Sequence, residues 1–307
     1  MNFFEKAFVS LTGHNHLKWI PDKLCVSILY RIHTKKRLRL DPPQTFNEKL
    51  QWLKLYDRNP RYTQLADKYL GKKLAAAIIG EEHIIPTLGV WDSFDEIPFD
   101  ELPDQFVLKC THDCGGLVVC KDKARLDRAA ARNKIVPCLK RNYYWAGREW
   151  PYKDIPPRII AEPYMTDSHV IGNPALDPDA DGLLDYKFYC FGGEPRFLYV
   201  AFANMKRGVK RDQLSFFDFS WQPTPFYRLD HEQLPFALEK PENLEEMIDI
   251  ARRLAQGIPF VRVDLYNLSG QVYFSEMTFI PGCGFGPFQP EEWERKLGDW
   301  IELPEKR

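Results

Sequence analysis

The chain has 307 residues, of which 44% are hydrophobic, 28% charged and 14% aromatic. This composition is ordinary for a globular protein, and the length allows one large or two medium domains. The formal net charge of -1 provides no overall attraction to nucleic acid, so we expect no nucleic-acid partner.

The cysteines favour a reducing compartment. There are seven of them, an odd number, and no Cys-x-x-Cys pair occurs, so neither a disulfide framework nor a structural zinc site is expected. The N-terminal residues contain no apolar signal region, and no apolar run reaches the roughly 18 residues of a membrane span. These features together predict a cytoplasmic protein.

The first 60 residues carry helical patterns. Pro21 opens a helix whose Leu24, Ile28 and Leu29 form an apolar stripe. The basic stretch 31–39, which contains no acid, follows. It could contact an anionic membrane or glycan, or be a solvated helix end whose cations favour the helix dipole. A capping box opens the next helix, with Thr45 as N-cap and Glu48 at N3.

Residues 105–120 read as a strand, a loop containing Gly115-Gly116 and a second strand. A glycine pair lets the backbone approach a ligand and point its N–H groups at phosphate oxygens. Lys109 ends the first strand and could hold phosphates as a point charge. A plain hairpin turn explains the same residues, and the chain contains no Gly-x-x-x-x-Gly-Lys-[Ser/Thr] P-loop.

Further along, a strand over 158–165 stops at Pro163, which has no N–H to donate. Residues 185–200 predict a strand, a Gly-Gly turn and another strand, with Asp185 and Lys187 on one face. A solvated strand face is the alternative interpretation of that pair.

The acidic segment Asp177-Pro-Asp-Ala-Asp-Gly182 allows three interpretations. It begins like an EF-hand loop, but Phe188 stands at position twelve, where that loop needs Glu. Asp177 and Asp179 also form the Asp-x-Asp of many nucleotide-sugar glycosyltransferases. A plain acidic loop is the third interpretation.

Residues 257–288 contain two β-type runs joined by a short Gly-containing turn, which predicts a hairpin. Val261, Val263 and Leu265 alternate with Arg262 and Asp264, and Glu276 and Thr278 share a face of the second run. The hairpin can therefore bring four polar side chains together. Two carboxylates and a hydroxyl suit Mg²⁺, and the arginine suits phosphate or carboxylate. The alternative is a surface hairpin with a polar face. The four side chains are Arg262, Asp264, Glu276 and Thr278.

Arg-x-Asp, a turn and Glu-x-Thr before Pro-Gly resemble the metal-binding signature of ATP-grasp enzymes, with Thr278 in place of the usual Asn. The phrase Phe-Asn-Glu-Lys-Leu-Gln-Trp-Leu-Lys-Leu-Tyr-Asp at 46–57 resembles the opening of the TupA-like branch, named for teichuronopeptide biosynthesis. The resemblance implies an α+β ATP-grasp fold, in which two lobes with antiparallel sheets enclose a nucleotide site behind a helical N-terminal segment. It implies a segment 1–60, an ATP-grasp domain 61–307 and a lid at about 105–163.

The resemblance also implies ATP and Mg²⁺ as cofactors and assigns site residues. The metal ligands would be Asp264, Glu276 and Thr278. The phosphate contacts would come from Lys68, Lys109, Lys187, Gly115 and Gly116. The adenine hinge would be Glu162, Tyr164 and Met165, with Asp185 on the ribose. Catalytic roles would fall to Arg262, Lys68 and His112. For Lys68 and His112, a surface lysine and a structural histidine are the alternatives. Asp113 and Cys114 depart from the small residues usual in the family's loop.

The implied activity is carboxylate–amine ligation through an acylphosphate, in bacterial capsule, teichuronopeptide or O-antigen biosynthesis. The implied partners are ATP, a carboxylated glycan or peptide acceptor, and an amine or amino acid. A cationic cluster lies where the family would place the acceptor, formed by Arg196, Arg207, Lys210 and Arg211. Two rivals remain: a glycosyltransferase of the same pathway that uses Asp177 and Asp179, and a non-catalytic nucleotide-binding protein.

Overall fold

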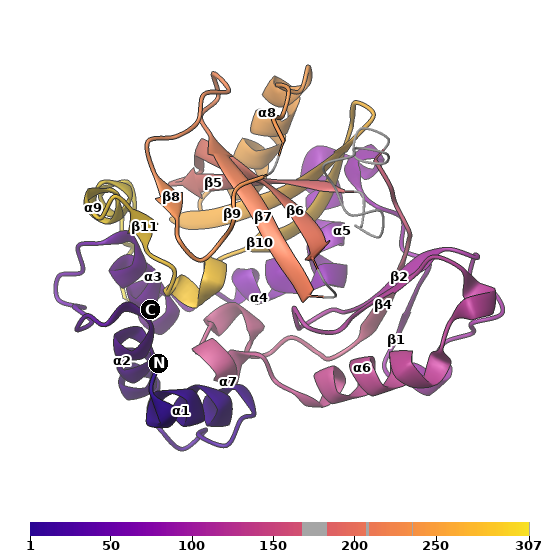
Figure 1. Cartoon of the computed structure of the whole chain (residues 1–307), viewed down its shortest axis with the longest axis horizontal. Coiled ribbons are helices and arrows are strands. Elements are labelled where there is room, and N and C mark those ends of the chain that lie inside the picture. The colour runs from indigo at the N-terminus through magenta and orange to yellow at the C-terminus, as the bar shows by residue number, and fades with distance from the viewer. Residues whose placement is uncertain (168–182, 207–208, 235, 307) are drawn as a thin grey trace.

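The computed structural model describes residues 1–167, 183–206, 209–234 and 236–306. Asp177 and Asp179, the proposed glycosyltransferase motif, lie outside the described residues. Figure 1 shows the two larger sheets apart from each other, with the N-terminal helices on one side of the molecule and the four-stranded sheet on the other. The α+β arrangement with antiparallel sheets that the sequence predicts is confirmed.

The larger sheet has five antiparallel strands in the order β10-β9-β5-β6-β7. Its apolar face is covered by the amphipathic helix α8 and by α5, which pack against its strands. Burial of alternating strand residues on one face stabilises this main core. Its elements are β5 Leu184–Phe191, β6 Glu194–Lys206, β7 Val209–Phe217, β9 Phe260–Leu268, β10 Gln271–Thr278, α5 Lys68–Ile79 and α8 Leu244–Ala255.

The smaller sheet has four antiparallel strands in the order β1-β4-β2-β3. The helix α6 packs on it and buries Ile135 against Phe106 and Leu108, which have no exposed surface. This unit therefore has a hydrophobic core of its own. It extends beyond the predicted lid at about 105–163, because β1, Phe94 and Phe99 also belong to it. Its elements are β1 Gly89–Trp91, β2 Phe106–Cys110, β3 Leu117–Cys120, α6 Arg128–Lys140 and β4 Ile159–Pro163.

The predicted N-terminal helices are confirmed, including the capping box of Thr45 and Glu48. They are tied to the body by polar contacts: Arg148 Nη2 donates to the Leu17 carbonyl at 2.8 Å, and the Tyr144 hydroxyl donates to Asp22 at 2.6 Å. The elements are α1 Phe3–Gly13, α2 Asp22–Thr34, α3 Phe46–Tyr56, α4 Pro60–Ala66 and α7 Tyr144–Gly147.

The phrase at 46–57 forms α3, whose polar side chains hold the loop that follows β10. Gln51 Nε2 donates to the Gly284 carbonyl at 2.7 Å, and Lys54 Nζ donates to the Cys283 carbonyl at 2.7 Å. Asn47 Nδ2 donates to Glu294 on α9 (Glu292–Asp299) at 3.0 Å. This unusual sequence phrase thus positions the chain just beyond the predicted metal ligands.

The C-terminal part completes the molecule beside α3, where β8 and β11 form a two-stranded sheet. None of the helices in the described residues has the length and apolar character needed to cross a lipid bilayer. The remaining elements are β8 Tyr227–Arg228, β11 Phe288–Gln289 and α9 Glu292–Asp299.

Candidate functional site

A cleft of about 310 Å³ lies between the two sheets, a size typical of small-ligand sites. The smaller sheet lines one wall and the larger sheet the other. Six of the site residues predicted from the sequence line this cleft. They are Lys109, Glu162, Tyr164, Met165, Asp185 and Lys187.

The predicted hairpin brings its four polar residues together, because Arg262 is the cross-strand partner of Thr278, and Asp264 is the partner of Glu276. A β-bulge makes this possible. Strict alternation would put Glu276 on the same face as Phe274, which is buried in the core. The register shift between Phe274 and Glu276 turns Glu276 to the face of Asp264.

Cations surround the carboxylate of Asp264, which has no exposed surface. Arg262 donates to both of its oxygens at 2.6 Å in a bidentate fork, and Lys187 bridges it to Asp185. Arg262 also donates to Thr278 Oγ1 at 2.9 Å. Asp264 and Glu276 supply the oxygen ligands that Mg²⁺ prefers, and Mg²⁺ commonly uses only one or two carboxylates together with phosphates and water. The donor set therefore fits Mg²⁺ that arrives with a nucleotide.

Lys68 links Glu276 of the hairpin to the loop of the smaller sheet. Its Nζ lies 3.7 Å from Glu276 and donates to the Asp113 carbonyl at 2.9 Å. Burial alone would raise the pKa of Glu276, but Lys68, Lys187 and Arg262 lower it to about 2. Glu276 is therefore ionised at neutral pH, as a metal ligand must be.

Glu162, predicted at the adenine hinge, bridges two lysines. Its carboxylate accepts from Lys72 and from Lys109 at 2.6 Å each. Burial favours the neutral acid, yet the two lysines hold the pKa of Glu162 below its usual value. Lys72 was not predicted as a site residue, although it lies one helical turn after Lys68 on α5 and so projects from a similar side of the helix.

In the loop between β2 and β3, His112 and Asp113 are held by contacts within the smaller sheet and its helix instead of facing the cleft. The imidazole Nε2 of His112 lies 3.1 Å from the carbonyls of Cys138 and Arg141, and His112 is buried and is not among the residues that line the cleft. Burial lowers its pKa. This placement favours the structural alternative for His112 over a catalytic role. The departure at Asp113 is explained by Arg141, which binds its carboxylate with two nitrogens.

Gly115 and Gly116 have different surroundings in this loop. The amide of Gly115 donates to Asp113 Oδ1 at 2.8 Å, so it is engaged within the loop. At Gly116 a Cβ would lie 2.3 Å from the Cys110 sulfur, so only glycine fits.

At the other end of the cleft, the Tyr164 amide donates to the Gln105 carbonyl at 3.5 Å. Met165 is therefore the better candidate for a backbone donor to a base. Asp185 Oδ1 is buried without a hydrogen-bond partner among the described residues. Burial raises the pKa of Asp185 to about 6, although Lys187 opposes the shift. An unsatisfied buried acceptor of this kind fits a ligand hydroxyl.

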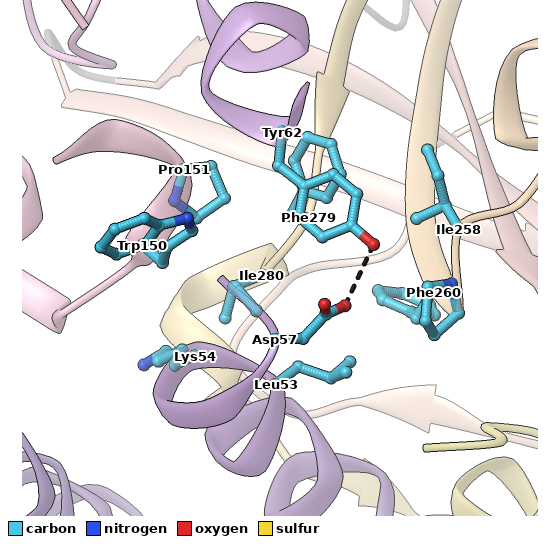
Figure 2. A pocket seen from close by; sticks show the side chains of 11 residues that line it. Leu53, Lys54, Asp57, Tyr62, Trp150, Pro151, Ile258, Phe260, Phe279 and Ile280 are labelled. Atoms are coloured by element: carbon cyan, nitrogen blue, oxygen red, sulfur yellow. Dashed lines mark hydrogen bonds between the residues drawn. The ribbon is translucent and has the colours of Figure 1, made fainter. Parts of the chain in front are cut away.

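Figure 2 shows a second, much smaller cavity, of about 20 Å³, between α3, Trp150 and the start of β9. Beside it the Tyr62 hydroxyl donates to Asp57 at 3.0 Å. The cavity has room for about one water molecule, so it is not a nucleotide site.

The cationic cluster predicted to hold the acceptor is only partly described. Arg196 lies over the ring of Trp300, 6.0 Å from its centroid. The other three side chains lie outside the described part of the chain.

Residues 48–302 match a family model described as TupA-like ATPgrasp, and no curated protein matches the chain. The structure is similar to D-alanine–D-alanine ligase from Bacillus anthracis complexed with ATP, with 13% identity and a TM-score of 0.38 over 71% of this chain and 54% of that chain. It is also similar to D-alanine–D-alanine ligase from Helicobacter pylori (16% identity, TM-score 0.39, 78% of this chain and 61% of that chain). A third similar structure is N5-carboxyaminoimidazole synthetase from Staphylococcus aureus complexed with ADP (12% identity, TM-score 0.40, 79% of this chain and 54% of that chain). The chain thus spans 54% to 61% of the lengths of these proteins.

Proposed function

Because the chain belongs to the TupA-like ATP-grasp family, we propose that it is an ATP- and Mg²⁺-dependent carboxylate–amine ligase. The observation that carries the proposal is the Asp264–Glu276 pair, surrounded by Lys68, Lys187 and Arg262 at one end of a cleft of nucleotide size. Cations that flank two carboxylates suit the phosphates of a nucleotide whose metal binds those carboxylates.

ATP would lie in the cleft with its base near Met165, a ribose hydroxyl at Asp185 Oδ1 and its phosphates toward Lys109 and Lys187. Asp264 and Glu276 would hold Mg²⁺, and Thr278 contributes at most a hydroxyl. The bound metal would offset negative charge on the phosphates. Phosphoryl transfer depends mainly on positioning and charge neutralisation.

In the proposed reaction, an acceptor carboxylate attacks the γ-phosphorus, ADP leaves, and an acylphosphate forms. An amine then attacks the acyl carbon, an amide forms, and phosphate leaves. Arg262 is the cation best placed to offset charge on the transferring group, because it lies 3.6 Å from Glu276 and grips Asp264.

The setting that we propose is bacterial surface-polysaccharide biosynthesis in the cytoplasm, with a carboxylated glycan or peptide as acceptor and an amino acid or amine as nucleophile. Support comes from the match to the TupA-like family, because the sequence phrase at 46–57 resembles that branch, which is named for teichuronopeptide biosynthesis.

The test is ADP release by the purified full chain with Mg²⁺-ATP and pairs of uronic acids and amines. Glu276→Gln should abolish ADP release while the melting temperature stays near that of the wild type, because the amide cannot replace the carboxylate on the metal. Glu245→Gln, on the exposed side of α8, is the matched control.

ADP release that is unchanged in Glu276→Gln would contradict the metal assignment. Consumption of a nucleotide sugar without ATP turnover, lost when Asp177 and Asp179 are both changed to Asn, would establish the glycosyltransferase instead.

A further inference from the structure

A second large cavity, of about 500 Å³, has a separate set of lining residues from the nucleotide cleft. One wall is the loop Pro281–Gly284 and its continuation to Pro287, directly after the metal-binding strand. The opposite wall comes from α1 and α2, including Leu29 and His33. These two residues precede residue 48, where the family match begins, so the N-terminal segment shapes this cavity.

A buried cation lines the cavity: Arg228, whose side chain is only 8% exposed. Glycines leave room for it: a Cβ on Gly286 would lie 2.0 Å from its Nη2, and a Cβ on Gly282 would lie 3.2 Å from the same atom. Its guanidinium donates through Nε to Asp230 Oδ1 at 2.9 Å and through Nη2 to Oδ2. The Asp230 side chain is 49% exposed, so a bidentate carboxylate already occupies Arg228 from the solvent side.

Aromatic side chains connect this cavity to the hairpin that carries Arg262 and Asp264. Arg262 Nη1 donates to the Tyr199 hydroxyl at 3.1 Å, and Tyr199 lines the nucleotide cleft. The Tyr199 ring lies 5.9 Å from the Tyr189 ring, whose centroid is 6.2 Å from that of Phe288, the residue that follows Pro287 of the cavity wall. A chain of ring contacts therefore links the cavity wall to Arg262.

The remaining walls are mostly apolar. The imidazole of His33 stacks on the Phe285 ring at a centroid distance of 4.9 Å and an interplanar angle of 4°, and Leu29 is buried beside them. A buried arginine beside apolar surface fits an anion attached to a partly apolar body, such as a carboxylated sugar ring.

We propose that this cavity binds the carboxylate-bearing acceptor and that Arg228 holds an acceptor carboxylate in place of Asp230. The proposal rests on the ligase function above and adds the location of its second substrate. Arg228 is a positioning residue, and the N-terminal helices determine which acceptors fit.

The test measures the binding of D-glucuronate, with neutral D-glucose as the comparison, by NMR titration of the full chain loaded with Mg²⁺ and a non-hydrolysable ATP analogue. Arg228→Gln should weaken glucuronate binding by about tenfold or more, the scale of a lost charge-assisted hydrogen bond. Asp230→Asn should preserve or strengthen binding, because it removes the competing carboxylate. Arg252→Gln, which removes a surface arginine bound to Glu194, should change nothing.

The melting temperature and the affinity for the ATP analogue show whether Arg228→Gln is folded. The second variant is Arg228→Lys, which keeps the positive charge but cannot bind a carboxylate with two nitrogens. Glucuronate affinity that is equal in the wild type and both Arg228 variants, or no preference over glucose, would overturn the proposal. A wild type that does not bind the ATP analogue would contradict the ligase function itself, whereas Arg228-dependent glucuronate binding would still support the acceptor site.

Discussion

Glu162 shows how strongly a single residue of the cleft depends on its partners. Its carboxylate neutralises Lys72 and Lys109 at the same time, and burying either cation without a partner would be costly. Phosphates of a bound nucleotide would offer the lysines a second source of negative charge. The trio therefore stabilises the fold without a ligand and keeps two cations available to one.

We expect the stability of the protein to fall in acid through Glu162. Its pKa is lowered in the folded state from the usual 4.5, so its contribution is complete above about pH 4.5 and is lost as the pH falls through the folded-state value. Glu162→Gln should lower the free energy of unfolding at pH 7 by about 3–5 kcal/mol. It should also flatten the dependence of that free energy on pH below 4.5.

Urea unfolding at a series of pH values measures both effects, with Glu245→Gln on the surface of α8 as the control. A variant whose pH profile runs parallel to that of the wild type would show that Glu162 does not carry this dependence. Mg²⁺-ATP should raise the melting temperature of Glu162→Gln more than that of the wild type, because phosphates can replace the lost carboxylate.

At the scale of elements, the hairpin β9–β10 and the helices α3 and α9 fix the site from two directions. The bulge before Glu276 turns its carboxylate toward Asp264, and α3 holds the following loop through Gln51 and Lys54. The helix α9 packs against the start of α3. The contact is so close that a Cβ on Gly298 would lie 2.4 Å from the Gln44 carbonyl oxygen.

Gly298→Ala should therefore push α9 away from α3, since the neighbouring atoms belong to the backbone and cannot rotate aside. The expected loss is about 1–3 kcal/mol of unfolding free energy, measured by chemical denaturation. Gly13→Ala, at the end of α1 with nothing within 4 Å of the added Cβ, is the matched control and should leave stability unchanged or slightly higher. Equal stability of the two variants would refute the packing argument.

At the scale of the whole molecule, two sheets with separate cores face each other across one cleft. Among the described residues, Lys68 and Lys72 on α5 contact the smaller sheet and its loop directly. The division into a segment 1–60, a domain 61–307 and a lid at about 105–163 stays a prediction. The main core includes Phe46 and Leu50, and the core of the smaller sheet includes Phe94 and Phe99, so both cores cross the proposed boundaries. A ligand between the sheets would add contacts to both.

Binding of Mg²⁺ with a non-hydrolysable ATP analogue should slow amide hydrogen exchange in the loop 111–116 and in the strand end 161–165, relative to Mg²⁺ alone. These segments line or border the cleft, and their amides should open less often once both walls contact one ligand. Protection confined to the N-terminal helices would place the nucleotide elsewhere.

The sequence by itself determined the elements whose signals are local: the capping box at Thr45, the glycine loop before Leu117, and a hairpin that carries Arg262 and Asp264 on one face. Turn chemistry and alternation depend on neighbours in the chain, so they can be recognised without the fold. The tertiary structure decided the rest, because it depends on residues distant in sequence. Lys72 donates to Glu162, which is 90 residues away in the sequence, and the imidazole of His112 lies against the carbonyl of Cys138. The guanidinium of Arg228 packs against two glycines, Gly282 and Gly286, of a loop more than fifty residues later in the chain.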